Sequence, residues 1–340
     1  MAKKVTLADI AAVVGVSNVA VYKALSDKPG VREELRKQIK EVAQQMGYKS
    51  SSSSEKKNSV QRTGNIGVVV PERYYGISAS FYGQMYEKVV RALFRCNYYG
   101  ILEILTYADE QNENMPRVFD ERRVDGVIFL GPIEERYSAE MVNRAKLPVY
   151  FMDTYHSALT FDTVISDGFH GTYMLTNYLI REGHRKIAFV GSVDATSSIA
   201  DRYWGYRRAL RERGIEYQEE WEIPDRDENG VTLDAILKDQ VIADAYVCNC
   251  DFVAYYVIQE LEKMGYCVPE DISVVGFDNF LPMGIGMEQV QITSYEVDME
   301  RMADICVKSL IRKIEGKKYM EGVQLVPGEI VYKKTVAPKK

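Results

Sequence analysis

Residues 6–46, TLADIAAVVGVSNVAVYKALSDKPGVREELRKQIKEVAQQM, predict three short amphipathic helices separated by a glycine turn and a DKPG loop. Thr6 is the expected N-cap of the first helix, where Asp9 completes a variant of the capping box. Gly15 turns the chain, and Ser17 is the expected N-cap of the second helix. This is helix-turn-helix spacing, in which the second helix lies in the major groove of DNA.

The second helix has an inward and an outward face. Val21, Ala24 and Leu25 are expected to pack inward, which leaves the other early residues free to contact base edges. With the two N-cap residues added, the predicted DNA-contacting residues are Thr6, Ser17, Asn18, Val19, Tyr22 and Lys23.

The distribution of charge supports this interpretation. Residues 1–63 hold 12 Lys/Arg and 6 Asp/Glu, a net charge of +6, whereas the whole chain carries −6. The remaining 277 residues therefore carry −12. A basic head on an acidic body is expected if one end contacts phosphate. The alternative is a small three-helix bundle with no role in DNA binding.

Composition narrows the class of protein. The 340 residues, 46% of them hydrophobic, allow two or three domains with well-filled cores. No apolar run reaches the ~20 residues of a membrane span, so we expect a cytoplasmic protein with no membrane partner. Five scattered cysteines favour reduced thiols over disulfides. Cys248 and Cys250 form an isolated C-x-C, and we predict no metal site and no cofactor.

Residues 49–63, KSSSSSEKKNSVQRT, mark a break in composition. The segment has five consecutive serines, and Val60 is its single apolar residue. Such a composition predicts a linker without a stable fold of its own.

From residue 65 apolar strands alternate with longer helices. Strands that are apolar on both faces predict parallel sheets covered by helices. The predicted strands are 65–71, 101–107, 124–131, 148–153, 163–167, 186–192, 221–225, 243–251 and 272–279. The predicted helices lie near 80–97, 138–146, 170–182, 201–213, 231–238 and 252–264. This many strands would overload one sheet. The predicted fold class is therefore α/β: a three-helix head followed by a two-lobed core of doubly wound parallel sheets.

Ligands of open parallel sheets bind outside the carboxyl ends of the strands. In this sequence those ends combine polar residues with aromatic ones, as in PERYYGISASFY (71–82) and DTYHSALTFD (153–162). Aromatic rings stack on the C–H face of a sugar, while carboxylates and arginine bind its hydroxyls, so the loops suit a hydroxylated ligand. The alternative is that strand-end loops are polar because they meet water.

Four segments, taken in order, resemble a LacI/GalR-family transcriptional regulator: VTLADIAAVVGVSNVAVYKAL, GHRKIAFVGS, DRYWGYRRAL and VPEDISVVGFDN. The resemblance runs from Val5 to about Val336. It implies a core like the periplasmic sugar-binding proteins, whose lobes close around a small, carbohydrate-like effector. It also implies a homodimer that binds double-stranded operator DNA with an affinity that the effector controls.

The same resemblance implies domain boundaries. The head would be residues 1–48, the hinge 49–63, and the effector-binding and dimerisation core 64–340. In the core, residues ~64–164 and ~295–318 would form the lobe nearer the DNA, here called lobe 1. Residues ~165–292 and ~322–335 would form the far lobe, here called lobe 2. The segment SYEVDMERMADICVKSLIRKI would supply a helix to lobe 1.

The effector contacts that the resemblance implies are Tyr75, Phe81, Tyr82, Arg202, Asp251 and Asp278. The planar fork of Arg202 suits paired hydroxyls or a carboxylate. An alternative for Arg202 is a salt bridge to a loop carboxylate such as Asp201, and for Asp278 a turn-capping role. Phe81 and Tyr82 would alternatively belong to the core.

The sequence departs from the family pattern in three places. The usual Thr-Val-Ser-Arg run of the recognition helix is Ala20-Val21-Tyr22-Lys23, so no operator sequence can be transferred. Cys250 replaces the asparagine of an Asn-Asp pair that Asp251 completes. The hinge has neither the proline nor the leucine that commonly wedges into the minor groove, and only Val60 is apolar there.

The favoured interpretation is an effector-responsive transcriptional repressor that is not an enzyme and has no catalytic residues. A solute-binding protein without gene regulation is the main alternative, and a sugar-modifying enzyme on a doubly wound core is another. Against the enzyme, the sequence has no P-loop, G-x-G-x-x-G, G-x-S-x-G or zinc signature.

Overall fold

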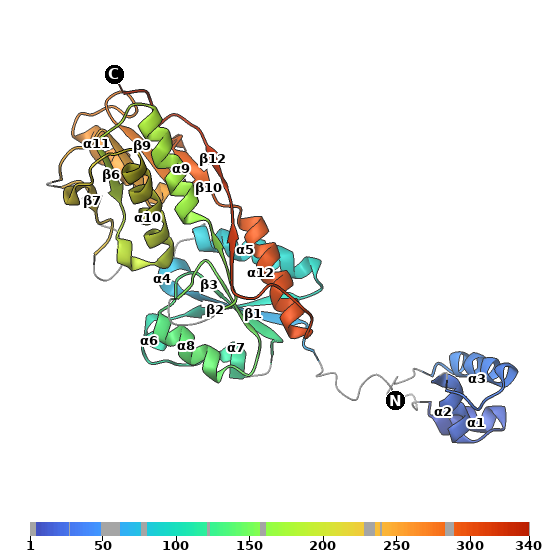
Figure 1. The fold of residues 1–340 in the computed structure, drawn as a ribbon. Helices are drawn as coiled ribbons and strands as arrows, with labels where there is room; N and C mark the ends of the chain where they lie inside the picture. The colour runs from blue at the N-terminus through green and yellow to red at the C-terminus, as the bar shows by residue number, and fades with distance from the viewer. Residues whose placement is uncertain are drawn as a thin grey trace. The chain divides into compact units, whose positions relative to one another are not determined.

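The chain divides into two compact units, residues 1–62 and 63–340 (Figure 1). The computed structural model describes residues 5–26, 28–48, 62–75, 80–120, 123–156, 161–227, 235–238, 240–282 and 289–339. Most of the predicted hinge, residues 49–61 with Val60, lies outside the described residues.

The smaller unit, the head, is built from three helices: α1 (Leu7–Val14), α2 (Asn18–Leu25) and α3 (Glu33–Gln45). The helices share a single core, whose fully buried residues are Ile10 of α1, Val21 and Ala24 of α2, and Ile39 of α3. Gly15 ends α1 with a φ of 72°, a left-handed conformation that glycine adopts without steric cost. The three predicted helices are therefore confirmed.

Lobe 1 of the larger unit contains a six-stranded parallel sheet in the order β11-β5-β4-β3-β1-β2. Its strands are β1 (Asn65–Pro71), β2 (Tyr99–Leu105), β3 (Gly126–Leu130), β4 (Val149–Met152), β5 (Thr163–Ser166) and β11 (Val323–Val326). Its helices are α4 (Glu72–Tyr75), α5 (Phe81–Arg95), α6 (Tyr107–Gln111), α7 (Arg117–Asp120), α8 (Glu135–Arg144) and α12 (Met299–Ile314). Helices α5 and α12 pack on one face of the sheet, and α7 and α8 on the other (Figure 1).

Lobe 2 contains a second six-stranded sheet in the order β12-β10-β9-β8-β6-β7, parallel except where β12 pairs with β10. Its strands are β6 (Ile187–Val190), β7 (Glu222–Ile223), β8 (Ala245–Cys248), β9 (Ser273–Asp278), β10 (Thr293–Glu296) and β12 (Glu329–Val331). Its α-helices are α9 (Gly168–Arg181), α10 (Ser197–Glu212) and α11 (Asp251–Lys263), and its 3-10 helices are η1 (Val193–Ala195) and η2 (Glu219–Trp221).

Successive residues of the central strands belong to cores on opposite faces of each sheet. In β1, Val68 and Val70 join the core under α5 and α12, whereas Val69 joins the core under α7 and α8. In lobe 2, Phe189 packs with α9 and α10, and Val190 packs with α11. This alternation explains why these strands read as continuous apolar runs in the sequence.

The predicted lobe boundary near residue 322 is wrong for one strand. Residues 323–326 form β11, which pairs with β5 in lobe 1, and only β12 continues into lobe 2. The sequence pattern does not predict β11 because it is an edge strand whose Val323 and Leu325 are 54% and 58% exposed. The sequence pattern also fails to predict strands β10 and β12 and the short helices α4, α6 and α7. Part of the helix expected near 231–238 is a turn at 236–238, and residues 231–234 lie outside the described ranges.

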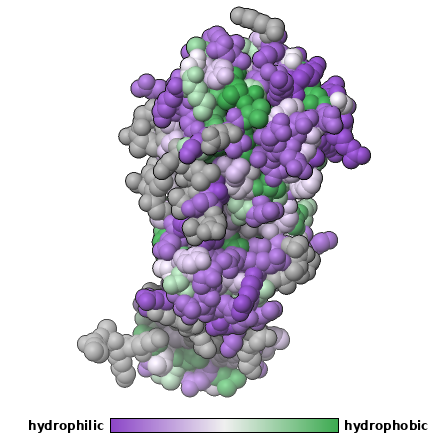
Figure 2. Space-filling view, turned by 90° about the vertical axis from the view of Figure 1, so that its left-hand side faces the viewer, coloured by the Kyte–Doolittle hydropathy of each residue, from purple (hydrophilic) through white to green (hydrophobic). Residues whose placement is uncertain are grey.

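The surface is mainly polar where it can be seen. Hydrophilic side chains predominate on the face shown in Figure 2, and hydrophobic ones gather mainly in the upper part, which holds lobe 2. Within the described ranges, no single helix is long and apolar enough to cross a membrane, and α1 and α2 reach that length only together, across a 105° bend.

Candidate functional site

The first residues of α2 form an exposed surface on the head. Ser17 caps the helix by accepting a hydrogen bond from the backbone N–H of Ala20 at 3.2 Å. Val19 is 61% exposed and Tyr22 36% exposed, while Lys23 is half-buried. Thr6 and Asn18 are exposed as well. All six residues predicted to contact DNA are thus at least partly accessible, and their role in binding DNA stays a prediction.

Two cations hold α2 and its tyrosine in place. Arg36 of α3 donates from Nη2 to the carbonyl of Lys28 at 2.8 Å and from Nη1 to the carbonyl of Lys23 at 3.4 Å. A cation at these carbonyls stabilises the C-terminal end of α2, where the helix dipole is negative. Lys28 also donates from Nζ to the hydroxyl of Tyr22 at 3.1 Å and lies 4.7 Å from the ring centroid. Arg36 and Lys28 are absent from the predicted set because neither lies on the recognition helix.

The two lobes meet where Phe81 of lobe 1 packs against Phe280 of lobe 2, and this junction is here called the cleft. On its lobe 2 side, Arg202 of α10 is fixed from three directions. Its Nη2 donates to Oδ1 of Asp278 at 3.0 Å, and its Nη1 donates to the carbonyl of Asn249. Its guanidinium lies 3.9 Å from the centre of the Phe277 ring. Side-chain exposure is only 7% for Arg202 and 11% for Asp278, so the ion pair is buried. Arg202 and Asp278, two of the three residues that the sequence singles out in lobe 2, are therefore direct partners, although they lie 76 residues apart.

A second ion pair lies beside the first. Arg226 donates to both carboxylate oxygens of Asp225, at 3.0 and 2.6 Å. Asp225 also accepts from Nδ2 of Asn249 at 2.7 Å and from the backbone N–H of Ser192 at 2.8 Å. These partners hold the pKa of Asp225 below its ordinary value despite the opposing effect of burial. Asp225 and Asn249 lie at the ends of predicted strands, but neither they nor Arg226 belong to the predicted effector contacts.

On the lobe 1 side, Tyr82 and Asp153 form a buried pair. The Tyr82 hydroxyl donates to Oδ2 of Asp153 at 2.8 Å. Gly131, which follows β3 with a φ of +94°, makes room for the Tyr82 ring, because a Cβ there would lie 3.0 Å from it. Asp153 follows β4, has a φ of 64° and is 3% exposed. The sequence predicted Tyr82 but not its partner, although Asp153 begins one of the strand-end loops.

Asp153 interacts electrostatically across the cleft. Burial raises its pKa from 3.8 to about 6, opposed by the Arg202 charge and the Tyr82 hydroxyl and reinforced by Asp278. Burial likewise raises the pKa of Asp278, and the Arg202 charge opposes this. The two lobes thus bring two carboxylates and one guanidinium within electrostatic range of one another.

Aromatic rings line the lobe 1 wall and reach lobe 2. The Phe81 ring lies 5.2 Å from Tyr82 in its own lobe and 6.0 Å from Phe280 of lobe 2, centre to centre. Tyr74 lies 5.4 Å from Tyr82, and Tyr75 packs edge-on against Tyr86 of α5 at 6.5 Å. Phe81 and Tyr82 therefore lie at the junction of the lobes. Tyr75 lies farther along the same wall, and its contact with an effector stays a prediction.

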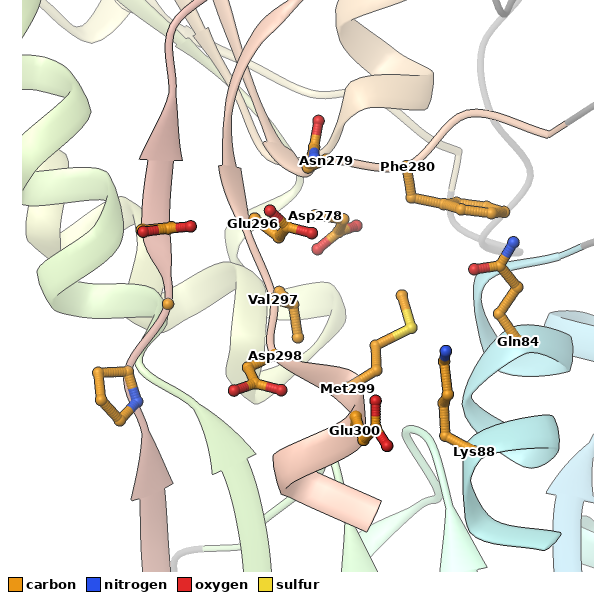
Figure 3. A pocket seen from close by; sticks show the side chains of 13 residues that line it. Gln84, Lys88, Asp278, Asn279, Phe280, Glu296, Val297, Asp298, Met299 and Glu300 are labelled. Atoms are coloured by element: carbon orange, nitrogen blue, oxygen red, sulfur yellow. The ribbon is translucent and has the colours of Figure 1, made fainter. Parts of the chain in front are cut away.

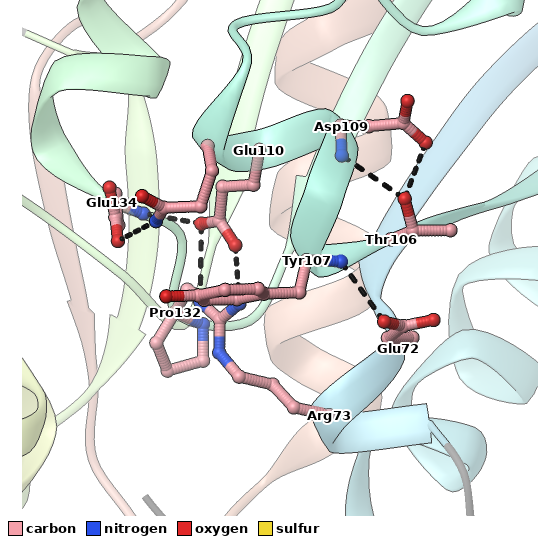
Figure 4. A network of polar contacts seen from close by, with 9 residues as sticks. Glu72, Arg73, Thr106, Tyr107, Asp109, Glu110, Pro132 and Glu134 are labelled. Atoms are coloured by element: carbon pink, nitrogen blue, oxygen red, sulfur yellow. Dashed lines mark hydrogen bonds and ion pairs between the residues drawn. The ribbon is translucent and has the colours of Figure 1, made fainter. Parts of the chain in front are cut away.

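A network outside the cleft holds α4, which carries Tyr74 and Tyr75 (Figure 4). Arg73 donates to both carboxylate oxygens of Glu110 and to the carbonyl of Pro132. Glu110 is 1% exposed and also accepts from the backbone N–H of Glu134 at 2.8 Å. We infer that this network positions the aromatic wall. No local signal in the sequence reveals it, because Arg73 and Glu110 are 37 residues apart.

The carboxylate of Asp251 has a partner within lobe 2. It accepts from the backbone N–H of Phe280 at 2.8 Å, and the residue is 2% exposed. Burial raises its pKa well above the ordinary value. This contact gives Asp251 a structural role in holding the Phe280 loop, and its predicted contact with the effector stays a prediction.

A groove of about 620 Å³ adjoins the cleft where the chain crosses between the lobes (Figure 3). Gln84 and Lys88 of α5 line it from lobe 1, and Asp278, Asn279 and Phe280 line it from lobe 2. The crossing segments 296–300 and 327–329 complete its wall. Because Asp278 belongs to both the groove and the Arg202 ion pair, the groove leads to the residues that the sequence singled out.

Two family models match the chain. The model described as bacterial regulatory proteins, lacI family, matches residues 6–51, and a periplasmic binding protein-like domain matches residues 176–336. The HTH-type transcriptional regulator RegA of Clostridium saccharobutylicum is 28% identical over 335 residues, covering 96% of this chain and 97% of that protein. The HTH-type transcriptional repressor PurR of Glaesserella parasuis serovar 5 (strain SH0165) is 26% identical over 313 residues, covering 91% and 90%.

Solved structures share the fold. A complex of the transcriptional regulator CelR with cellobiose has a TM-score of 0.70 and 22% identity, covering 98% of this chain and 100% of that chain. The lac repressor dimer bound to operator and the anti-inducer ONPF has a TM-score of 0.67 and 20% identity, with the same coverage. A two-lobed core behind a helix-turn-helix head is thus an arrangement known in DNA-binding regulators.

Proposed function

The chain belongs to the LacI family of bacterial regulatory proteins, and from this premise we propose that it represses transcription by binding an operator whose affinity a small effector controls. One observation carries the proposal: the same chain joins a recognition helix with exposed early residues to a cleft where Arg202, Asp278, Tyr82 and Asp153 converge from two lobes. The head supplies the DNA contact, and the cleft supplies the ligand contact.

The cleft supports a hydroxyl-rich effector. Arg202 and Asp278 present a fixed donor and acceptor, and the rings of Phe81 and Phe280 provide apolar surfaces for the C–H face of a sugar. CelR, one of the structural neighbours, was solved with cellobiose. A ligand that contacts both walls would favour the closed arrangement of the lobes, because only that arrangement offers both sets of contacts.

The active species in this proposal is a homodimer that acts in the cytoplasm. Two-fold symmetric operators are matched by two-fold symmetric proteins, and the lac repressor structure is that of a dimer. Phe94 of α5 and Tyr99, the first residue of the edge strand β2, are 71% and 68% exposed, and they supply an apolar surface for a second copy. Analytical ultracentrifugation tests this: Tyr99→Asp should shift a dimer toward monomer.

The decisive experiment selects DNA from random duplexes with the full-length protein. A single enriched motif is expected, bound with an affinity that falls steeply as salt rises, because phosphate contacts release counterions. Tyr22→Ala should weaken binding to the motif more than binding to random DNA. Absence of any enriched motif, or specific binding that survives deletion of residues 1–48, would contradict the proposal.

A thermal-shift screen of sugars and sugar derivatives tests whether the protein binds such an effector, since a ligand that binds the native state raises the melting temperature. Each stabilising compound is then added to the protein–operator complex. A regulator changes its DNA affinity when the compound binds. A solute-binding protein would bind the compound with no effect on DNA, and an enzyme would convert it to product.

A further inference from the structure

The outer face of α10 combines positive charge with an exposed tryptophan. Four side chains lie on this face because they follow one another at the helical spacings i, i+3, i+4 and i+7: Trp204, Arg207, Arg208 and Arg211. Together with Phe169 of α9 and residues 214–217 after α10, they line a groove of about 660 Å³ on lobe 2. These four residues are here called the arginine face.

Two of the three arginines are held by neighbours within lobe 2. The guanidinium carbon of Arg207 lies 3.5 Å from the centre of the Tyr217 ring. Arg208 donates from Nε to Oε1 of Glu212 at 2.8 Å. Arg211 is exposed, and no described residue pairs with it. A ligand of this face therefore meets two ordered guanidinium groups and a third that has no counter-charge among the described residues.

The exposure of Trp204 indicates the kind of partner. Trp204 is 56% exposed, whereas the other tryptophan of the chain, Trp221, is 8% exposed. Tryptophan and arginine are enriched among the residues that dominate binding energy at protein–protein interfaces. Small molecules, in contrast, bind in cavities that bury most of their surface. An exposed face of this composition therefore favours a protein partner.

An apolar surface on the edge strand of lobe 1 adjoins the arginine face. Phe169 lines the groove beside α10 and also a second groove of about 510 Å³, to which Val323 and Leu325 of β11 contribute. Both β11 side chains are more than half exposed. In the lobe 1 sheet β11 lies at the opposite edge from β2, so this apolar surface stays accessible in the homodimer proposed above.

We propose that the arginine face and the β11 edge bind a segment of another protein in which acidic residues alternate with apolar ones. Its carboxylates pair with Arg211, and its apolar side chains cover Trp204 and Leu325. The charge of the core favours such a segment over nucleic acid. Residues 64–340 carry −12, and Glu212 and Glu216 lie among the arginines, so a long polyanion is repelled while a short acidic segment meets the local positive charge.

The test selects peptides from a random displayed library on the full-length protein. At least one enriched group should combine Asp or Glu with apolar residues. Tryptophan-free peptides of this group should protect Trp204 from quenching by acrylamide, because Trp221 is already shielded from solvent. If no such group is enriched, or if its binding leaves the quenching unchanged, the proposal is overturned.

Three variants locate the peptide, with affinity measured by fluorescence anisotropy. Arg211→Glu reverses the unpaired charge, so affinity should fall at least about tenfold while the melting temperature stays that of wild type. Leu325→Asp should also weaken binding, because it places an acid beside the acidic peptide. Lys263→Glu makes the same charge reversal at an exposed site on α11, which packs on the opposite face of the lobe 2 sheet, and should leave the affinity unchanged.

Two outcomes overturn the proposal at this stage. Equal peptide affinities for Arg211→Glu and Lys263→Glu would remove the arginine face from the binding site. A change in the oligomeric state of Arg211→Glu alone, measured by analytical ultracentrifugation without peptide, would assign the face to a second copy of this chain.

Discussion

The head and the cleft assemble their functional surfaces in different ways. The head takes all its predicted DNA-contacting residues from one stretch between Thr6 and Lys23, ordered by helix caps and a small apolar core. The cleft takes its residues from strand ends and helices of two lobes, such as Tyr82 with Asp153 and Arg202 with Asp278. In the head, each local interaction contributes only a little to the free energy of unfolding. In the cleft, removing one partner of a buried ion pair lowers that free energy by much more.

The largest effect is expected from Arg202→Ala. Losing the guanidinium leaves Asp278 buried without a cation, so the free energy of unfolding of the core should fall by about 3–5 kcal/mol. Urea denaturation followed by tryptophan fluorescence measures this, because both tryptophans, Trp204 and Trp221, lie in the larger unit.

Two variants accompany the measurement. Arg211→Ala, on the same helix but exposed, should cost much less. Adding Asp278→Asn to Arg202→Ala should restore part of the stability, because position 278 then carries no unpaired charge. Equal losses for Arg202→Ala and Arg211→Ala would show that the cleft has no buried ionic anchor.

Asp153→Asn is expected to stabilise the core while it impairs ligand binding. Burial raises the pKa of Asp153 to about 6; the Arg202 charge and the Tyr82 hydrogen bond oppose this rise, and the Asp278 charge adds to it. Between about pH 4 and pH 6 the folded state therefore keeps a proton that the unfolded state has already released. Stability from this group is therefore full below about pH 4 and is lost as the pH rises to about 6. At pH 7.5 the free energy of unfolding of the variant should therefore exceed that of wild type by about 2–3 kcal/mol.

The pH dependence provides the check. The difference between Asp153→Asn and wild type should vanish near pH 4, as measured by urea denaturation at both pH values. Asp109→Asn should instead lower the free energy of unfolding at pH 7.5. Hydrogen bonds from Thr106 and Asn114 lower the pKa of Asp109, so its ionised form is the stabilising one. A destabilised Asp153→Asn at pH 7.5 would mean that the carboxylate is satisfied in the resting protein.

In the head, Arg36→Ala should have an intermediate effect. The variant loses the hydrogen bond to the carbonyl of Lys28 and the contact at the end of α2, which together contribute about 1–2 kcal/mol. Operator affinity, measured by fluorescence anisotropy, should fall more than in Lys37→Ala, which removes the same charge from an exposed site on α3. Equal affinities for the two variants would show that Arg36 acts on DNA only through its charge.

The smallest expected effect separates two roles of Ser17. Ser17→Ala removes the N-cap of α2 and should destabilise the head by about 1 kcal/mol, as measured by circular dichroism melting. Ser17→Asp keeps a capping oxygen and should preserve that stability, yet it should weaken operator binding because a carboxylate would face phosphate. Unchanged operator affinity in Ser17→Asp would remove Ser17 from the DNA-contacting surface.

Sequence reasoning reaches as far as local patterns extend. The continuous apolar strands of the core are visible because their alternate residues pack into cores on both faces, as Val69 and Val70 do. The edge strand β11 escapes because Val323 and Leu325 are largely exposed. Arg202 and Asp278 were found through motifs, but their pairing was not.

The sequence by itself determined the three helices of the head, the surface of α2, and the alternation that requires parallel sheets. Caps, turns and helical or strand periodicity act over a few residues, so they are legible in a linear chain. Only the tertiary structure decided which strand ends meet. It placed Asp153 beside Tyr82, 71 residues away, and Glu110 beside Arg73, 37 residues away. These partners depend on the order of strands in the lobe 1 sheet, which brings together the ends of strands that lie far apart in the chain.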